Sequence, residues 1–374
     1  MSQKLCYTLI LPKLTISSKL AQQSITLQDI FSIHPADTNP CHCVSQEGAL
    51  PEIAALTPTF RRDIKYFELL HESVLRFTPN NVCHHIIIPD EDIALFSGWK
   101  SSRLAIHTTR SLLPKGFLSI SALSKLIGTL PYAKSLPALR ALSRGELFLD
   151  IRSPWPPIRG WVLQQILKFA AVGSMNVDAV LMLDSDVVLV NRISSDDLVH
   201  GGAVRFYRKP KAILPEMTKH IAWHETARRI LGIPERLHTE AADYVPSFLV
   251  WDPSIVRAIQ KRLEEVNQRD WSRVLARELT VSEWTIYGSY VDHLGTDTNR
   301  SFVSSNSLCS SYWDASALNR DNIARFVASV SQSDLAILVQ STSGTSQEIR
   351  KEIVETVLSR FARQQEMNET PATT

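Results

Sequence analysis

The sequence has few cysteines, no long apolar run and little net charge, and each shortage excludes a class of protein. Five cysteines among 374 residues are scattered and odd in number, so they do not indicate a disulfide framework. No apolar run approaches the roughly 18–20 residues that span a bilayer. Residues 5–10 are too short for a signal-peptide core and lack a cleavage site after them. A net charge of +2 is too small for a dedicated nucleic-acid-binding protein. We therefore expect a cytoplasmic protein.

Hydrophobic and charged residues, 44% and 21% of the chain, are present in the proportions of a globular protein with a sizeable core. Short apolar runs at residues 53–56, 85–88 and 104–107 alternate with segments of helical periodicity. This alternation predicts an α/β fold with a mostly parallel central sheet and helices on both faces. We expect one domain over residues 51–366, after a poorly ordered extension at residues 1–50 and before a flexible tail at residues 367–374.

Residues 111–157 interrupt this rhythm. The stretch 117–127 has an amphipathic pattern, and prolines follow it at intervals. We therefore expect a helical insertion here. Basic residues far outnumber acidic ones between Lys100 and Lys168, which indicates either a solvated face or contact with an anionic ligand, including the anionic surface of a membrane.

Two aspartates, Asp184 and Asp186, follow the most apolar strand pattern of the chain, residues 179–183. Ligands of α/β proteins bind at the carboxyl ends of parallel strands, where this pair is expected. Carboxylate oxygens suit Mg²⁺ or Mn²⁺, which bridge the phosphates of nucleotides. The sequence thus predicts a metal site, although an ordinary solvated turn after a strand has the same pattern.

Two further groups of polar residues flank this strand pattern. Thr57, Thr59 and Arg62 follow the first strand, where a nucleotide would lie, but Thr59 is equally suited to capping a helix. Gln164 and Lys168 share one face of a predicted helix at residues 161–172, with Gln165 beside them. This face either binds the phosphates and hydroxyls of a ligand or is simply solvated.

Several blocks of this chain resemble, in the same order, an uncharacterised bacterial family of GT-A-type glycosyltransferases. The resemblance covers about residues 53–345. The blocks that carry it are Thr57-Pro58-Thr59 with Asp63, residues 85–92, Gly160-Trp161 with Gln164-Gln165 and Lys168, Leu183-Asp184-Ser185-Asp186, Tyr244-Val245-Pro246 with Trp251, Ser282-Glu283-Trp284 with Tyr287-Gly288, and Val339-Gln340-Ser341. Pro246 and Trp284 depart from the pattern, which puts the fit of an acceptor in doubt more than the metal motif.

The resemblance implies a GT-A fold that moves a sugar from a nucleotide-diphosphate sugar to a hydroxyl acceptor, which is a glycan or a lipid-linked molecule. In that setting Asp186 binds Mn²⁺ or Mg²⁺, and Asp184 contacts the donor and completes the metal site. A histidine late in the chain completes the metal site in some such enzymes, and His293 is the candidate here. Glu283 is the first candidate for the base that takes the acceptor's proton, with Asp243 as the second. A helix-capping role for Glu283 and a structural role for His293 remain open.

Two other functions also fit the Asp-x-Asp pattern. A phosphatase of the haloacid-dehalogenase type uses the first aspartate as its nucleophile, but this type normally begins its core with that strand. A later strand of such phosphatases ends in an acidic pair, whereas the pattern at residues 335–339 ends in Gln340 and Ser341. A degenerate protein that binds a nucleotide sugar without turnover is the second alternative.

Overall fold

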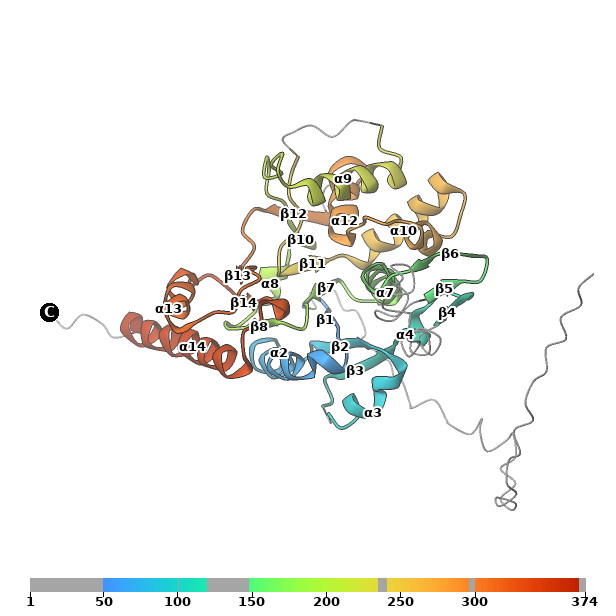
Figure 1. Cartoon of the computed structure of the whole chain (residues 1–374). Helices are drawn as coiled ribbons and strands as arrows, with labels where there is room; N and C mark the ends of the chain where they lie inside the picture. The colour runs from blue at the N-terminus through green and yellow to red at the C-terminus, as the bar shows by residue number, and fades with distance from the viewer. Residues whose placement is uncertain (1–49, 100, 120–147, 235–240, 296–299, 370–374) are drawn as a thin grey trace, which may run out of the picture. The chain divides into compact units, whose positions relative to one another are not determined.

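The computed structural model describes residues 50–99, 101–119, 148–234, 241–295 and 300–369 (Figure 1). The extension expected at residues 1–50 lies outside the described residues except for Leu50. Residues 367–369 of the expected tail continue the last helix, and the rest of that tail is also outside. The described residues form one compact unit. Within the described ranges, no helix has both the length and the apolarity needed to cross a membrane.

A mixed five-stranded sheet forms the centre of this unit, in the order β11-β7-β1-β2-β3. Its strands are β1 (Ile53–Pro58), β2 (Cys83–Ile88), β3 (Leu104–Thr108), β7 (Ala179–Met182) and β11 (Leu249–Trp251). β7, β1, β2 and β3 pair in parallel, and only β11 runs antiparallel to its neighbour. The predicted α/β class and the mostly parallel sheet are therefore confirmed.

Helices cover both faces of the central sheet (Figure 1). Side chains alternate along a strand, so Ala54 and Leu56 of β1 pack in one apolar cluster with Phe169 of helix α7 (Gly160–Ser174). The intervening residues of β1 belong to a second cluster, with Leu70 of helix α2 (Ile64–Phe77). Helix α2 buries one apolar stripe, whereas α7 is buried on most sides.

Three smaller sheets surround the central one, in the orders β12-β10-β9, β13-β14-β8 and β4-β5-β6. Their strands are β4 (Phe117–Ser119), β5 (Phe148–Asp150), β6 (Ser153–Ile158), β8 (Val187–Leu189), β9 (Val199–His200), β10 (Ala203–Tyr207), β12 (Ser301–Ser304), β13 (Cys309–Tyr312) and β14 (Ala336–Val339). The remaining α-helices are α3 (Ile93–Phe96), α4 (Thr109–Leu112), α8 (Ser195–Leu198), α9 (Thr218–Leu231), α10 (Pro253–Asn267), α11 (Trp271–Ala276), α12 (Glu283–His293), α13 (Arg320–Ser329) and α14 (Gln347–Glu369).

The expected helical insertion is wrong at both of its described ends. Residues 117–119 form β4, which pairs antiparallel with β5, and β5 pairs with β6. Phe117 of β4 and Phe148 of β5 are buried in the main apolar cluster, so both strands are anchored to the core. The rest of the predicted helix, residues 120–127, lies outside the described residues.

The segment that contains Tyr287 and Gly288 is helical. Both lie inside helix α12, which the Ser282 side chain begins by accepting a hydrogen bond from the Thr285 backbone N–H (3.4 Å). Such a capping serine is a standard start for a helix, so Glu283 occupies the first helical position rather than a loop.

Candidate functional site

A cleft of about 1140 Å³ lies at the carboxyl ends of β1, β2 and β7. The residues after these strands line it, together with one face of α7 and the start of α9. Its position agrees with the general placement of ligands at the ends of parallel strands. Its size suits a ligand of several rings and charged groups rather than a single small molecule.

Asp184, Ser185 and Asp186 form the loop between β7 and β8, and all three line the cleft. Ser185 Oγ donates a hydrogen bond to Oδ2 of Asp63 (3.0 Å), which lines the same cleft. Asp186 Oδ2 accepts a hydrogen bond from the backbone N–H of Ser341 (2.6 Å), just after β14. The loop therefore brings carboxylates from β7 and from the start of α2 to one wall.

Burial is the main reason that the Asp186 pKa rises to about 6, and the negative charge of Asp184 raises it further. Burial also raises the pKa of Asp63, partly opposed by its hydrogen bond from Ser185. Concentrated, poorly solvated negative charge of this kind is unfavourable until a cation approaches it. The electrostatics of this wall thus favour binding of a positive group.

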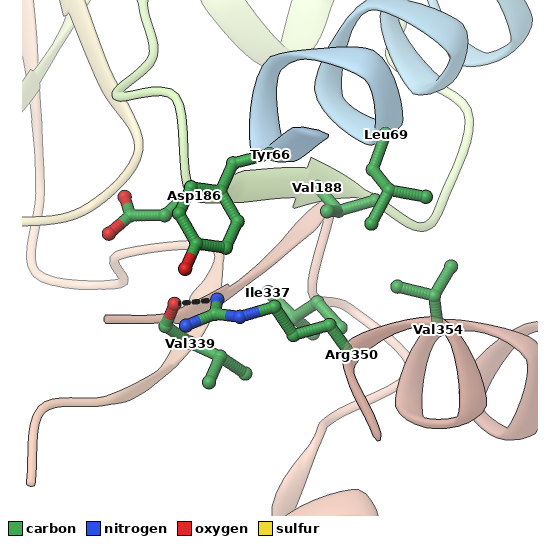
Figure 2. Close-up of a pocket in the computed structure, with 8 residues that line it drawn as sticks. All are labelled: Tyr66, Leu69, Asp186, Val188, Ile337, Val339, Arg350 and Val354. Carbon is green, nitrogen blue, oxygen red and sulfur yellow. Dashed lines mark hydrogen bonds between the residues drawn. The ribbon is translucent and has the colours of Figure 1, made fainter. Parts of the chain in front are cut away.

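Figure 2 shows the protein side of Asp186, where the guanidinium of Arg350 lies against the ring of Tyr66. The Arg350 guanidinium carbon is 4.5 Å from the centre of that ring, and its nitrogens donate hydrogen bonds to the carbonyls of Val339 and Gln340. The carboxylate of Asp186 extends away from the apolar side chains of this small pocket. Arg350 therefore fixes the chain after β14, and that segment in turn holds Asp186.

Lys168 is the cation closest to the aspartate pair, and its side chain is almost fully buried. Its Nζ lies 3.1 Å from Asp184 Oδ1 and 2.9 Å from Glu283 Oε1. Burial alone would lower the pKa of Lys168, but the two carboxylates outweigh it and raise that pKa above the usual range. Nζ also lies 5.2 Å from the ring centre of Trp284. The ammonium group therefore stays charged.

Glu283 is buried, 2% exposed, at the first position of α12, and it is not among the residues that line the cleft. One oxygen pairs with Lys168, and the other, Oε2, has no hydrogen-bond partner in the described part of the chain. The structure therefore brings Glu283 to the aspartate pair through Lys168 rather than into the cleft itself.

The predicted polar face of α7 divides into two. Gln164 and Lys168 line the cleft, as their shared face predicts. Gln165 does not: it is buried and donates a hydrogen bond to the carbonyl of Val281 (3.0 Å), which also accepts one from Trp161 Nε1 (3.0 Å). Gln165 thus attaches α7 to the segment before α12.

The residues after β1 divide in the same way. Thr57 is fully buried, and its Oγ1 lies 2.9 Å from Nε2 of His84 on β2. Thr59 and Arg62 both line the cleft. The alternative in which Thr59 caps the helix is wrong, since Phe60 occupies the cap position without a side-chain bond. Thr59 Oγ1 is buried with no hydrogen-bond partner among the described residues.

The cleft lining also contains Asp243, the second candidate for the base. Its backbone exchanges two hydrogen bonds with Lys209 (3.0 and 2.8 Å), and its Oδ1 accepts one from the N–H of Val245 (3.1 Å). His220, at the start of α9, places Nδ1 3.6 Å from Asp243 Oδ1. Sequence reasoning missed His220 as a site residue, because no neighbour in the sequence reveals the distant aspartate.

His293, the expected third metal ligand, is an exposed residue at the end of α12. Its Nε2 lies 3.2 Å from Nη1 of Arg228, and it is not among the residues that line the cleft. In the described ranges, no three histidine, cysteine, aspartate or glutamate residues are grouped as a ready-made metal site.

Aromatic residues that the sequence did not single out as one surface also gather at the cleft. Trp161 and Trp223 stack with their ring centres 6.4 Å apart. Lys219 Nζ lies 5.6 and 4.8 Å from those two centres. Trp284 and Trp313 complete the set. This aromatic wall and the carboxylates line the same cleft, a combination that suits a ligand with both ring faces and charged groups.

The model of a protein family described as "Family of unknown function (DUF6492)" matches residues 51–359. The chain belongs to this family. The matched range includes every residue of the cleft named above, so the site is part of the region that defines the family. No match to this chain is found among curated proteins.

Proposed function

We propose that this member of the DUF6492 family is a metal-dependent glycosyltransferase. It would move a sugar from a nucleotide-diphosphate sugar to a hydroxyl of a glycan or lipid-linked acceptor, on a fold of the GT-A type. The observation that carries the proposal is the pair Asp184 and Asp186 in the loop after β7, lining a cleft of about 1140 Å³.

The residues on this wall fit a divalent cation such as Mn²⁺ or Mg²⁺. Asp186 uses Oδ2 for Ser341, and Asp184 uses Oδ1 for Lys168, so each carboxylate keeps one oxygen for another partner. The raised pKa of Asp186 supports the same conclusion, because a cation would relieve the crowding of negative charge. When bound, the metal would offset the charge of the leaving diphosphate. The third ligand expected at His293 finds no support in its position.

The donor is proposed to occupy the end of the cleft formed by β1 and α7. The Thr59 hydroxyl, the Arg62 guanidinium and the Gln164 amide lie there and can bind ribose, phosphate and sugar oxygens. The buried Lys168 ammonium group forms an ion pair with Asp184 and so orients that carboxylate. Thr57 and Gln165 do not contact the donor: Thr57 connects β1 to β2, and Gln165 connects α7 to the segment before α12.

The acceptor is proposed to enter between the aromatic wall and Asp243. Asp243 lines the cleft, whereas the Glu283 carboxylate forms an ion pair with Lys168 and does not line the cleft. We therefore propose that the proton acceptor is Asp243 or a group beside it, rather than Glu283. Glu283 keeps a positioning role, since its charge holds Lys168 beside Asp184.

Calorimetry with UDP, GDP and their sugars, each with and without Mn²⁺, tests the proposal. We expect wild-type protein to bind one nucleotide only with the metal, and the Asp186→Asn variant to lose at least about 10-fold in affinity, which is about 1.4 kcal/mol. Asp196→Asn, in the first turn of α8 and outside the cleft lining, is the control. Equal affinity in Asp186→Asn and wild type would contradict the metal assignment.

A phosphatase is the main competing function, and wild-type protein together with an Asp184→Asn variant distinguishes it. Hydrolysis of p-nitrophenyl phosphate by wild type, lost in Asp184→Asn, together with no affinity for any nucleotide, would favour the phosphatase. Metal-dependent nucleotide binding without release of the sugar would instead favour a binding protein that lacks turnover.

A further inference from the structure

The proton of the acceptor has few places to go in this cleft. If the chain transfers sugars as proposed, a hydroxyl oxygen bonds to the anomeric carbon while the bond from that carbon to the diphosphate breaks and its electrons leave with the diphosphate. The hydroxyl proton must pass to a base in the cleft. Asp184 and Glu283 are both paired with Lys168, and Asp186 and Asp63 carry the charge that attracts the metal.

The surroundings of His220 restrain its ring. It lies in the first turn of α9 and lines the cleft. Its ring centre is 4.8 Å from that of Trp223, and its Nδ1 faces Asp243 Oδ1 at 3.6 Å. Asp243 itself is fixed by its backbone pairing with Lys209 and by the hydrogen bond from Val245. A fixed carboxylate on one ring nitrogen directs the other nitrogen, Nε2, away from it.

We propose that His220 is the catalytic base and that Asp243 is its positioning residue. Nε2 of His220 accepts the proton of the attacking hydroxyl, while Nδ1–H is oriented toward the carboxylate of Asp243. That carboxylate stabilises the imidazolium formed when the proton arrives. The separation of 3.6 Å is longer than a hydrogen bond, and such pairs commonly shorten when the substrate is bound.

The charged and titratable groups around His220 are compatible with this role. Asp243 is the anionic group that faces its ring, and Tyr207 of β10 senses the same carboxylate, which adds to the effect of burial in raising the Tyr207 pKa. His224, one turn along α9, has a pKa lowered to about 4, mainly by burial, so it stays neutral near pH 7. Lys219 lies over the indole rings of Trp161 and Trp223.

Hydrolysis of the bound nucleotide sugar, with water as the acceptor, tests the inference without knowledge of the natural acceptor. UDP-glucose, UDP-galactose and GDP-mannose are the probes, each with Mn²⁺, and release of the nucleoside diphosphate is measured from pH 5 to pH 9. We expect wild-type turnover to fall on the acidic side of this range, because a base must be unprotonated to accept the hydroxyl proton. His220→Asn should lose about 100-fold in turnover and lose this acidic limb, while Mn²⁺-dependent nucleotide affinity stays within about three-fold.

Asp243→Asn provides the second variant, because a positioning role makes a distinct prediction. The acidic limb should remain but move to lower pH, since the imidazolium loses the carboxylate that stabilises it. His200→Asn, an exposed histidine on β9 outside the cleft lining, is the matched control and should keep the wild-type profile.

The outcomes separate this inference from the function on which it rests. If wild-type protein neither binds nor hydrolyses any of the three probes, both are overturned. If wild type is active and His220→Asn keeps its turnover and acidic limb, only the base assignment is overturned. An Asp243→Asn variant that loses turnover with an unshifted limb would overturn the positioning role.

Discussion

The buried ammonium group of Lys168 lies between the carboxylates of Asp184 and Glu283. Its loss would leave the charge of Glu283 buried without a partner. Its side chain is 4% exposed and that of Glu283 is 2% exposed. Burying either charge alone is strongly unfavourable, whereas the pair compensates itself. The charge balance of the proposed donor site therefore depends on contacts made beneath its surface.

We predict that Lys168→Met lowers the free energy of unfolding by about 3–5 kcal/mol, because Glu283 is then buried without its counter-charge. The double variant Lys168→Met with Glu283→Leu should cost much less than the two single changes added together. Urea denaturation monitored by circular dichroism measures all of these values.

Lys261→Met is the control for this cycle. Lys261 pairs with Glu265 across one helical turn at 3.7 Å, with both side chains more than half exposed, so its loss should change stability by less than about 0.5 kcal/mol. Equal effects of the Lys168 and Lys261 substitutions would show that the buried pair is not coupled as the distances indicate.

At the scale of elements, the contact of α12 with the segment before β11 depends on the missing side chain of Gly288. A Cβ at this position would lie 2.2 Å from Cγ of Tyr244, whose ring is buried and whose hydroxyl donates to Asp292 Oδ2 (2.6 Å). The ring therefore cannot move aside without losing that bond. Close approach of two elements, rather than a turn, explains the glycine here.

We predict that Gly288→Ala destabilises the protein by about 1–3 kcal/mol. Alanine favours a helix over glycine by up to about 1 kcal/mol, but a clash with a ring held on the other side outweighs this gain. Thermal denaturation of Gly288→Ala beside Gly98→Ala, where a Cβ meets nothing within 4 Å, provides the comparison. Stabilisation by Gly288→Ala would mean that Tyr244 is free to shift.

The elements also show how far sequence patterns reach. Helix α7 was predicted closely from its helical spacing, and strands β1 and β7 were predicted closely from their short apolar runs. β4 and β5 were missed because three-residue strands carry almost no pattern, and their pairing joins residues far apart in the chain. Local sequence cannot encode that kind of neighbour.

The same limit applies to the candidate site. Gln164 and Lys168 were placed on one face correctly, because helical spacing decides it. Gln165 and Thr57 were placed in the site although they face inward, since a polar residue looks the same in sequence whether it binds a ligand or a backbone carbonyl. His220 was missed because Asp243 reaches it only through the fold.

At the scale of the whole molecule, buried histidines make stability sensitive to acid. His71 and His84 approach within 3.0 Å, as do His85 and His107 at 2.9 Å, and no such pair can carry two protons facing each other. Burial lowers the pKa of His84 far below its usual range and that of His85 and His224 to about 4, and it lowers those of His71 and His107 as well.

The sign follows from proton binding. Unfolded histidines take up protons near pH 6.5, whereas the folded ones do so only at lower pH, so the unfolded state binds more protons between about pH 6.5 and 4. Stability is therefore complete above pH 6.5 and falls as the pH drops through this window. Each histidine contributes up to about 1.4 kcal/mol per pH unit. Asp186 and Asp63, whose pKa values are raised, act in the opposite direction but are outnumbered by the five histidines.

We predict a loss of about 3–6 kcal/mol in the free energy of unfolding between pH 7 and pH 5. Urea denaturation at pH 7, 6 and 5 measures it, with His85→Gln expected to reduce the slope. A pH-independent free energy of unfolding over this range would contradict the burial of neutral histidines.

The loop that carries the two aspartates also joins two separate sheets. Leu183 hydrogen-bonds to β1 of the central sheet, whereas Val187 pairs with β14 of another. Asp184 is held by α7, which packs on the first sheet, and Asp186 by Ser341, which follows the second. A ligand that binds one oxygen of each carboxylate would therefore connect the two sheets. This part of the protein would be stiffer with the ligand bound than without it.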